Sequence, residues 1–386
     1  MTQNPSVPDP TLLLTRVAVS SFFMLHGFFV ATWISRIPAE AERLHLSAAV
    51  LGLVLLGNTT GALLAGLTSG GIVGSLGSRR VVRGAAILSS LALVSLGLMA
   101  QPSALFVGLA VFGFSVGNLN IAMNAQAAAL EARYGKPIFS SFHALWSLGA
   151  LLGALAGSGL AGLGLVPLGH FAMVGLLGIA LAWQIGQRLL ASSGTPGRAV
   201  FVLPRGSLLM IGLMGFCAAI SDSSISGWSG VYLRSLHAPE SVAALGFAVY
   251  QSVMLLGRSG GDWLVGRFGA VATVRYSALL GGLGLVLAVA TGTLWGIFVG
   301  IACMGWGLAN TFPLMFASAA RTEGMSPASA MASASTMSTL GGLSGPVLLG
   351  AVAELATVRA SYAVAALLTF AVSYLAVALA NYRTRG

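Results

Sequence analysis

The chain has 386 residues, of which 56% are hydrophobic and 7% are charged, and its formal net charge is +10. About a quarter of the residues in soluble domains are charged, so this composition excludes an ordinary soluble protein and indicates an integral membrane protein. Most of the 19 lysines and arginines are distributed over short connections between apolar runs, which argues against a concentrated nucleic-acid-binding face.

Residues 1–10 are polar and lack the charged start and cleavage site of a secretory signal, so the first apolar run is expected to be a retained span. Twelve apolar runs follow, and an α-helix needs about 20 such residues to cross a bilayer. The first six runs lie at about 12–35, 47–74, 81–100, 104–129, 138–162 and 166–188. The second six lie at about 206–233, 241–266, 271–290, 294–319, 325–350 and 360–381.

These runs predict an all-α polytopic membrane protein with twelve transmembrane helices in two pseudo-symmetric six-helix bundles, residues 1–188 and 206–386. Residues 189–205 contain the stretch SSGTPGR, which is rich in turn formers. We expect this segment to be a central cytoplasmic linker.

Basic residues fall mostly on every second connection, and such residues stay on the cytoplasmic side of membrane proteins. The pattern predicts a cytoplasmic (inner) membrane protein with both termini in the cytoplasm. The basic residues on that side would be Arg79, Arg80, Arg83, Arg133, Lys136, Arg188, Arg198, Arg205, Arg267, Arg275, Arg321, Arg383 and Arg385. Only Arg36, Arg43, Arg234 and Arg359 would then lie outside.

The two halves carry related turns, which indicates an internal repeat of the kind found in many transporters. After the second run the sequence GGIVGSLGSRR begins at Gly70 and includes Gly77, and after the eighth run GDWLVGRFG spans 261–269. Arg83 and Arg275 each follow the last glycine of their turn by six residues, and the offset between the halves is 192 to 194 residues.

Several motifs resemble the major facilitator superfamily and, within it, the YbjJ group near the fucose-permease-like branch. They are Trp33-Ile-Ser-Arg36-Ile-Pro38, Met123-Asn124-Ala-Gln126, Phe142-His143-Ala-Leu-Trp146-Ser147, Trp228-Ser-Gly-Val-Tyr232-Leu-Arg234 and Asn310-Thr-Phe-Pro313, together with the glycine-arginine turn. The resemblance implies two six-helix bundles that rock around a central cavity lined mainly by helices 1, 4, 7 and 10. The family's turn usually carries an aspartate where this chain has Gly74, and the second half has Gly266 in the same place.

Asp222, in the seventh run, is the most informative polar residue, because a carboxylate within a membrane must be paired, hydrated or protonated. It is a candidate for proton coupling or substrate binding. The alternative is a structural carboxylate that is hydrogen-bonded to Ser221, Ser223 and Ser224, or one that is hydrated near the outer mouth.

His26 and His143 are further candidates for proton coupling, since an imidazole can gain or lose a proton near neutral pH. The alternative for each is a neutral hydrogen bond between helices. Proton-coupled relatives often use acids in helices 1 or 4, but here the nearby acids, Glu40 and Glu42, are expected in the first outside loop.

Polar and aromatic side chains within the runs define a candidate substrate site. Its members are Trp33, Asn120, Asn124, His143, Trp146, Asp222, Ser226, Trp306 and Asn310. Ordinary helix packing or a position at the membrane interface is the alternative for each tryptophan.

Arg258 and Asp262 lie four residues apart in the eighth run, where they are expected to share a helix face. We interpret them as a cytoplasmic gate, and the alternative is a local pair that neutralises two charges. The resemblance adds Gly70, Gly77, Arg79 and Arg80 to the gating candidates.

No metal-ligand cluster, phosphate-binding loop or cofactor motif is present in the sequence, so we expect no enzyme, no cofactor and no nucleic-acid partner. The leading hypothesis is a monomeric secondary active transporter for a small organic solute, coupled to protons and surrounded by membrane lipids. Uptake of a sugar-like solute is slightly favoured over export of drugs or metabolites. A non-transporting membrane sensor or lipid-handling scaffold is the alternative from a different class.

Overall fold

The computed structural model describes residues 10–135, 138–191, 206–322 and 327–380, which form helices joined by turns. In the first half the helices are α1 (Pro10–Arg43), α2 (Ala48–Leu76), α3 (Ser78–Leu96), α4 (Pro102–Tyr134), α5 (Phe139–Gly162), α6 (Pro167–Gln184) and the short η1 (Gly186–Arg188). In the second half they are α7 (Ser207–Ser226), α8 (Ser229–Ser235), α9 (Glu240–Ser259), α10 (Gly261–Thr291), α11 (Leu294–Leu308), α12 (Thr311–Ala319), α13 (Pro327–Leu355), α14 (Val358–Leu375) and η2 (Ala376–Leu379).

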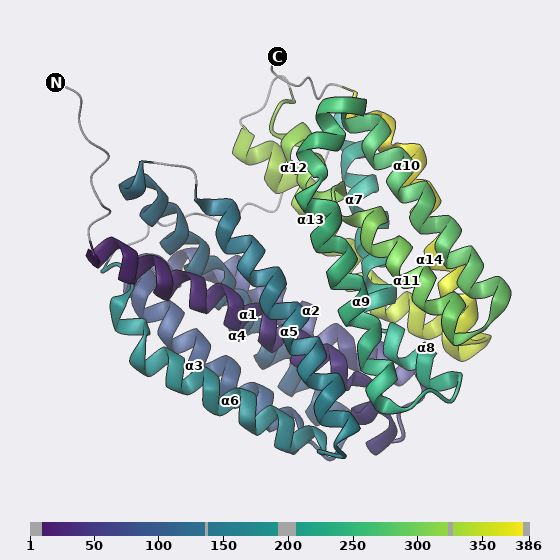
Figure 1. The fold of residues 1–386 in the computed structure, drawn as a ribbon, viewed down its shortest axis with the longest axis horizontal. Helices are drawn as coiled ribbons and strands as arrows, with labels where there is room; N and C mark the ends of the chain where they lie inside the picture. Colours follow the sequence, from purple (N-terminus) through teal and green to yellow (C-terminus); the bar gives the residue numbers. More distant parts are fainter. Residues whose placement is uncertain (1–9, 136–137, 192–205, 323–326, 381–386) are drawn as a thin grey trace.

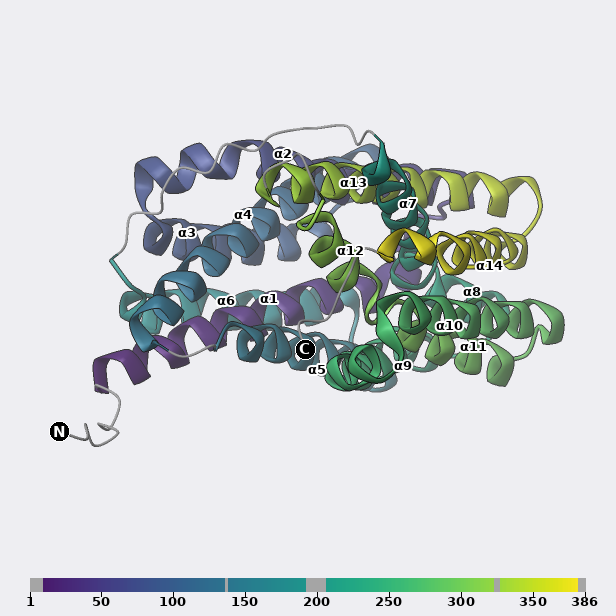
Figure 2. The same cartoon turned by 90° about the horizontal axis from the view of Figure 1, so that it is seen from above.

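Helices α1–α6 pack mainly against one another, as do α7–α14, and we call these sets the first and second helix groups (Figure 1). The groups meet where α2 packs on α13 and α5 packs on α9, as the perpendicular view also shows (Figure 2). We call the side where α1 begins and α14 ends the termini side, and the opposite side the far side. In Figure 1 the groups diverge toward the termini side at the top.

Eleven helices of the described residues are long and apolar enough to cross a membrane, one fewer than the twelve spans predicted. The missing span is 81–100, which the structure forms as α3. Its first turns carry Arg79, Arg80 and Arg83, so too few apolar residues remain for a clear span. Helix α3 nevertheless packs lengthwise on α4 and α6.

Three predicted spans are interrupted in the structure, although the run 294–319 still corresponds to one candidate membrane span, Leu294–Ala319. The run 206–233 is divided between α7 and α8 at Gly227 and Trp228, and the run 294–319 is divided between α11 and α12. The run 241–266 is divided at Gly260, where α9 ends, and α10, which begins at Gly261, is itself interrupted by non-helical backbone at Gly269 before the next predicted span. Apolar composition alone does not reveal such breaks, because it is the same on both sides of them.

The two glycine turns predicted to be equivalent have nearly the same backbone. Gly77 has φ 79° and ψ 144°, and Gly269, which lies 192 residues later, has φ 81° and ψ 162°. A side chain is strongly disfavoured in this region of backbone space, so glycine is required at both turns. This geometry supports the internal repeat.

Small residues allow α1 and α5 to approach closely. A Cβ atom on Gly149 would lie 2.0 Å from the Met24 carbonyl oxygen, and one on Gly157 would lie 2.1 Å from Ser35 Oγ. Close backbone approach of this kind is typical of helix packing in membranes. It fixes α1, which carries several functional candidates, against the rest of the first group.

Candidate functional site

A cavity of about 120 Å³ lies between the two helix groups. It is lined by Val30, Trp33, Ile34, Ile37, Leu55, Asn58, Thr59, Phe112, Val116, Ser223, Ser226, Gly227 and Pro346. The lining helices are α1, α2, α4, α7 and α13, so the cavity includes the predicted helices 1, 4 and 7 but not α11 or α12. The structure thus brings two predicted substrate residues, Trp33 and Ser226, to one site.

Asn58 is a candidate binding residue that sequence reasoning missed. It is half-buried in the central cavity, and within the described part of the chain its Oδ1 atom is buried without a hydrogen-bond partner. Such an acceptor is unfavourable unless water or a ligand satisfies it. The polar stretch Asn58-Thr59-Thr60 within an apolar run is the signal that could have identified it.

Asp222 is paired with a residue that the sequence did not single out. The hydroxyl of Tyr250, a buried residue on α9, donates a hydrogen bond to Asp222 Oδ1. The serines that neighbour Asp222 donate instead to backbone carbonyls, those of Ala365 for Ser221, Ala219 for Ser223 and Ser221 for Ser224. The alternative in which these serines hydrogen-bond to the carboxylate is therefore wrong, and the partner of Asp222 comes from a different helix.

His26 has both ring nitrogens occupied. Trp146 Nε1 donates to His26 Nδ1 at 2.6 Å, and the other nitrogen lies 3.1 Å from the Val116 carbonyl oxygen. A neutral imidazole has one donor and one acceptor, so Nε2 must carry the proton that it donates to Val116. This geometry supports a neutral hydrogen bond between helices, because a second proton would break the bond to Trp146.

The other predicted substrate residues are dispersed. His143 is exposed and lies between the rings of Phe23 and Phe139, with centroid distances of 5.4 and 5.2 Å. Asn124 donates to the side chain of Asn120 at 3.1 Å and to its carbonyl at 2.8 Å, one helical turn away. The structure does not place these three residues around the central cavity.

Arg258 and Asn310 complete the hydrogen bonding of two broken helices. Pro313 has no N–H group to donate to the Ala309 carbonyl, and Arg258 Nε donates to that carbonyl at 3.3 Å. The end of α9 likewise frees the Gly257 carbonyl, which accepts from Asn310 Nδ2 at 3.0 Å, while Trp306 packs against Gly257. Through this hydrogen bond Asn310, which lies between α11 and α12, holds α9 against the point where the two helices meet.

The ion pairs among the described residues do not include Arg258 and Asp262, so the alternative of a local pair that neutralises two charges is wrong for this structure. The break at Gly260 puts Asp262 in the next helix, so the four-residue spacing no longer gives a common face.

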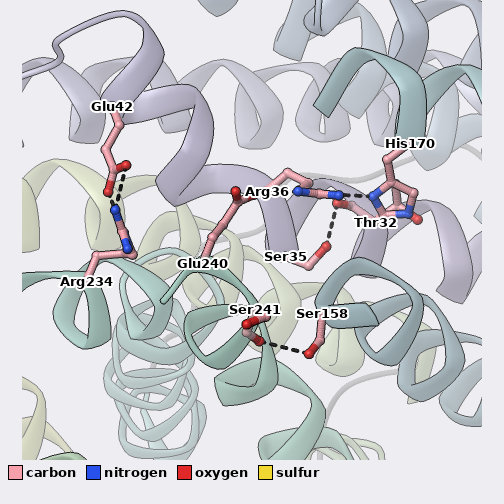
Figure 3. A network of polar contacts seen from close by, with 9 residues as sticks. All are labelled: Thr32, Ser35, Arg36, Glu42, Ser158, His170, Arg234, Glu240 and Ser241. Atoms are coloured by element: carbon pink, nitrogen blue, oxygen red, sulfur yellow. Dashed lines mark hydrogen bonds and ion pairs between the residues drawn. The ribbon is translucent and has the colours of Figure 1, made fainter. Parts of the chain in front are cut away.

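Arg36 forms the principal ionic link between the two groups (Figure 3). Its Nη1 atom lies 2.5 Å from Glu240 Oε1, and its Nε donates to His170 Nδ1 at 3.2 Å. The Arg36 side chain is fully buried, whereas that of Glu240 is 31% exposed. We had predicted Arg36 and Glu40 in an outer connection, but α1 continues to Arg43, and both side chains are buried.

Three further hydrogen-bonded links join the groups. Arg234 binds Glu42 through Nε and Nη2 at 2.6 and 2.9 Å, which raises the pKa of the arginine, and Ser158 Oγ donates to the Ser241 carbonyl (Figure 3). The N–H of Ala49 donates to Glu354 Oε2 at 3.1 Å. Together with Arg36–Glu240, these are the hydrogen-bonded links between groups within the described residues, and all of them lie on the far side.

The remaining gating candidates lie on the termini side. Gly70 is within the last turns of α2, Gly77 ends that helix, and Arg79 and Arg80 begin α3. Neither arginine contacts the central cavity. Their position is away from the ionic links that hold the two groups together.

Comparisons with known proteins identify the class. The family model for the Major Facilitator Superfamily matches residues 211–385. An uncharacterised MFS-type transporter of Yersinia pestis is 33% identical over 365 residues, which cover 93% of this chain and 94% of that protein. An uncharacterised transporter, y4wD, of Sinorhizobium fredii is 34% identical, with 93% of this chain and 96% of that protein covered.

Solved structures agree at the level of the fold. The nucleoside transporter NupG has a TM-score of 0.74 at 13% identity, covering 96% of this chain and 100% of that one. A D-xylose-proton symporter has a TM-score of 0.75 at 14% identity, covering 94% and 97%. The chain therefore belongs to the major facilitator superfamily, and its relatives point to a transport rather than a catalytic role.

Proposed function

We propose that this protein is a proton-coupled secondary transporter that moves a small organic solute by alternating access. The observation that carries the proposal is the position of the links between the groups. Within the residues that the structure describes they all lie on the far side, while a cavity lies between the groups at the level of Trp33 and Ser226. Such an arrangement allows the groups to close alternately on either side of a central solute.

In this proposal residues 1–188 and 206–386 act as two six-helix bundles joined by the segment 189–205, most of which lies outside the described residues. Both termini face the cytoplasm, and the chain resides as a monomer in the cytoplasmic membrane. The far side is then the outer side, and the structure corresponds to a state that is closed to the outside. A bacterial Spinster homologue described as inward-facing and occupied, with a TM-score of 0.69 at 17% identity, supports this assignment.

The solute site would combine Trp33, an aromatic face, with the hydrogen-bonding groups of Asn58, Thr59, Ser223 and Ser226. Aromatic rings beside a few oriented polar groups suit a sugar-like solute. Nucleoside and xylose transporters among the structural neighbours support this choice, as does the resemblance to the fucose-permease-like branch. Export of an apolar drug or metabolite is the second candidate, favoured by Ile34, Ile37, Leu55 and Phe112 in the same lining.

Asp222 would carry the coupling proton, with Tyr250 as the hydrogen-bond donor to its ionised form. His143 would be the second candidate for the coupling proton, and Arg258 and Asp262 would act as a gate when the cytoplasmic ends of the two groups approach. His26 would serve to hold α1, α4 and α5 together.

Reconstitution into proteoliposomes tests the function. We expect one or more solutes from a panel of sugars, nucleosides and drugs to accumulate when a proton gradient is imposed. In Asn58→Ala we expect the selection of transported solutes to differ from that of the parent. Flux of an apolar drug alone would favour the export alternative. The absence of flux under every ion gradient, with the protein correctly folded, would favour a sensor or scaffold and contradict the proposal.

A further inference from the structure

A second cavity lies on the termini side of the first helix group, away from the proposed transport path. It has a volume of about 440 Å³, which is within the range of about 300–1,000 Å³ that ligand sites usually occupy. It is lined by Gly74, Ser75, Leu76, Gly77, Arg79, Arg80, Arg83 and Ala191. The end of α2, the start of α3 and the last described residue before 192–205 therefore meet at this cavity.

The charge of this cavity is strongly unbalanced. Three arginines line it, and no acidic side chain is among the residues of its wall. Arg83 Nε donates to the Ala182 carbonyl at 3.3 Å, but no hydrogen bond or ion pair engages Arg79 or Arg80 in the described structure. Like charges at close range repel each other, so an anion in the cavity would stabilise this arrangement.

The internal repeat shows that the fold does not require these two arginines. The turn at Gly269 has nearly the same backbone as the turn at Gly77, 192 residues earlier. At that offset the counterparts of Arg79 and Arg80 are Val271 and Ala272, whereas Arg83 corresponds to Arg275. The same turn therefore occurs once with two adjacent arginines, Arg79 and Arg80, and once without them.

Two local features make this cavity more favourable for an anion. Gly74, on the wall of the cavity, has no side chain that could neutralise the arginines. Helix α3 begins at the cavity, and its N-cap residue Gly77 makes no side-chain hydrogen bond to the first turn. The N–H groups of that turn, and the helix dipole, add to the positive potential.

We infer that this cavity binds an anionic phosphate group, held by Arg79, Arg80 and Arg83. Guanidinium groups bind phosphate oxygens in pairs with matched geometry, which makes phosphate a better fit than a simple halide. The phosphate can belong to a lipid headgroup or to a small phosphorylated solute. Leu76, which is 52% exposed beside the arginines, offers an apolar surface for the first of these sources.

The test compares the full-length protein with two double variants of equal charge. Arg79→Gln/Arg80→Gln removes the site, and Arg267→Gln/Arg275→Gln removes two arginines at the equivalent turn of the second half. Thermal unfolding midpoints are measured in neutral detergent with inorganic phosphate or with chloride at equal ionic strength. They are also measured in nanodiscs of phosphatidylcholine with and without phosphatidylglycerol.

We expect the midpoint of the parent and of the Arg267/Arg275 variant to rise by a few degrees with the phosphate ligand, and that of the Arg79/Arg80 variant to stay unchanged. A rise only with phosphatidylglycerol would identify a lipid headgroup, and a rise with inorganic phosphate would identify a soluble source. The inference is overturned if the parent responds to neither ligand, or if the Arg79/Arg80 variant responds as strongly as the parent. None of these outcomes depends on solute transport.

Discussion

At the scale of single residues, the polar groups within the membrane region divide into those that hold helices together and those that remain available. His26, Asn310 and the Nε atom of Arg258 have partners that only the folded helices provide. Asn58 Oδ1 has no partner among the described residues. Asp222 accepts a hydrogen bond from Tyr250, but its carboxylate can still gain or lose a proton. Since a buried donor or acceptor without a partner is costly, the available groups are the ones from which binding and coupling are expected.

Asp222 provides the most direct test at this scale. In Asp222→Asn the amide oxygen can still accept the hydrogen bond from Tyr250, but the side chain can no longer gain or lose a proton. We expect solute accumulation under a proton gradient to be lost, while exchange of solute across the membrane persists. The measurement is accumulation and exchange in proteoliposomes, with Glu42→Gln, which removes an exposed carboxylate, as the control. Accumulation by Asp222→Asn at the parent level would remove this residue from coupling.

The sequence indicated which polar residues were unusual but not which of them would meet. Arg36 and Glu240 lie 204 residues apart, and no local pattern links them. Tyr250 was overlooked because a tyrosine within an apolar run is ordinary until a carboxylate is found beside it. The pairing of Arg258 with Asp262 was predicted from helical spacing, and the break at Gly260 invalidates that spacing.

At the scale of helices, apolar runs were sufficient to locate almost every element, because the bilayer requires long apolar helices. The breaks were not predicted, since they depend on partners elsewhere. The Ala309 carbonyl tolerates the loss of its helical hydrogen bond because Arg258 donates to it from α9. The repeated turns were predicted, because glycine in this backbone region leaves a clear signal.

These turns give a prediction for stability. Gly77→Ala and Gly269→Ala each force a side chain into a region that only glycine readily adopts, so each is expected to destabilise the protein by about 1–3 kcal/mol. Gly84→Ala is the control, because Gly84 lies inside α3 and an added Cβ atom meets nothing within 4 Å. Unfolding in detergent measures all three variants. Equal stability of the turn variants and the control would contradict the requirement for glycine at these turns.

At the scale of the whole molecule, closure of the far side depends on links of unequal strength. The Arg234–Glu42 pair is 32% and 52% exposed and is expected to contribute only about 0–1 kcal/mol. Arg36 is fully buried, and removal of its partner would leave an uncompensated charge that costs about 3 kcal/mol or more. Such a difference shifts a two-state equilibrium by roughly 100-fold, so Arg36–Glu240 is expected to dominate the closed far side.

The most direct test of alternating access is the distance across the far side, measured by electron spin resonance between labels on the two groups. Cysteines replace Leu163, at the end of α5, and Leu355, at the end of α13, which are 83% and 88% exposed. The native Cys217 and Cys303 are changed to serine to keep the labels specific. Glu240→Gln is compared with the control Glu42→Gln.

We expect a short distance in the parent and in Glu42→Gln, and a substantial population at longer distance in Glu240→Gln, as the far side opens. An unchanged distance in Glu240→Gln, or a similar increase in both variants, would contradict the claim that the buried Arg36–Glu240 pair holds the two groups closed.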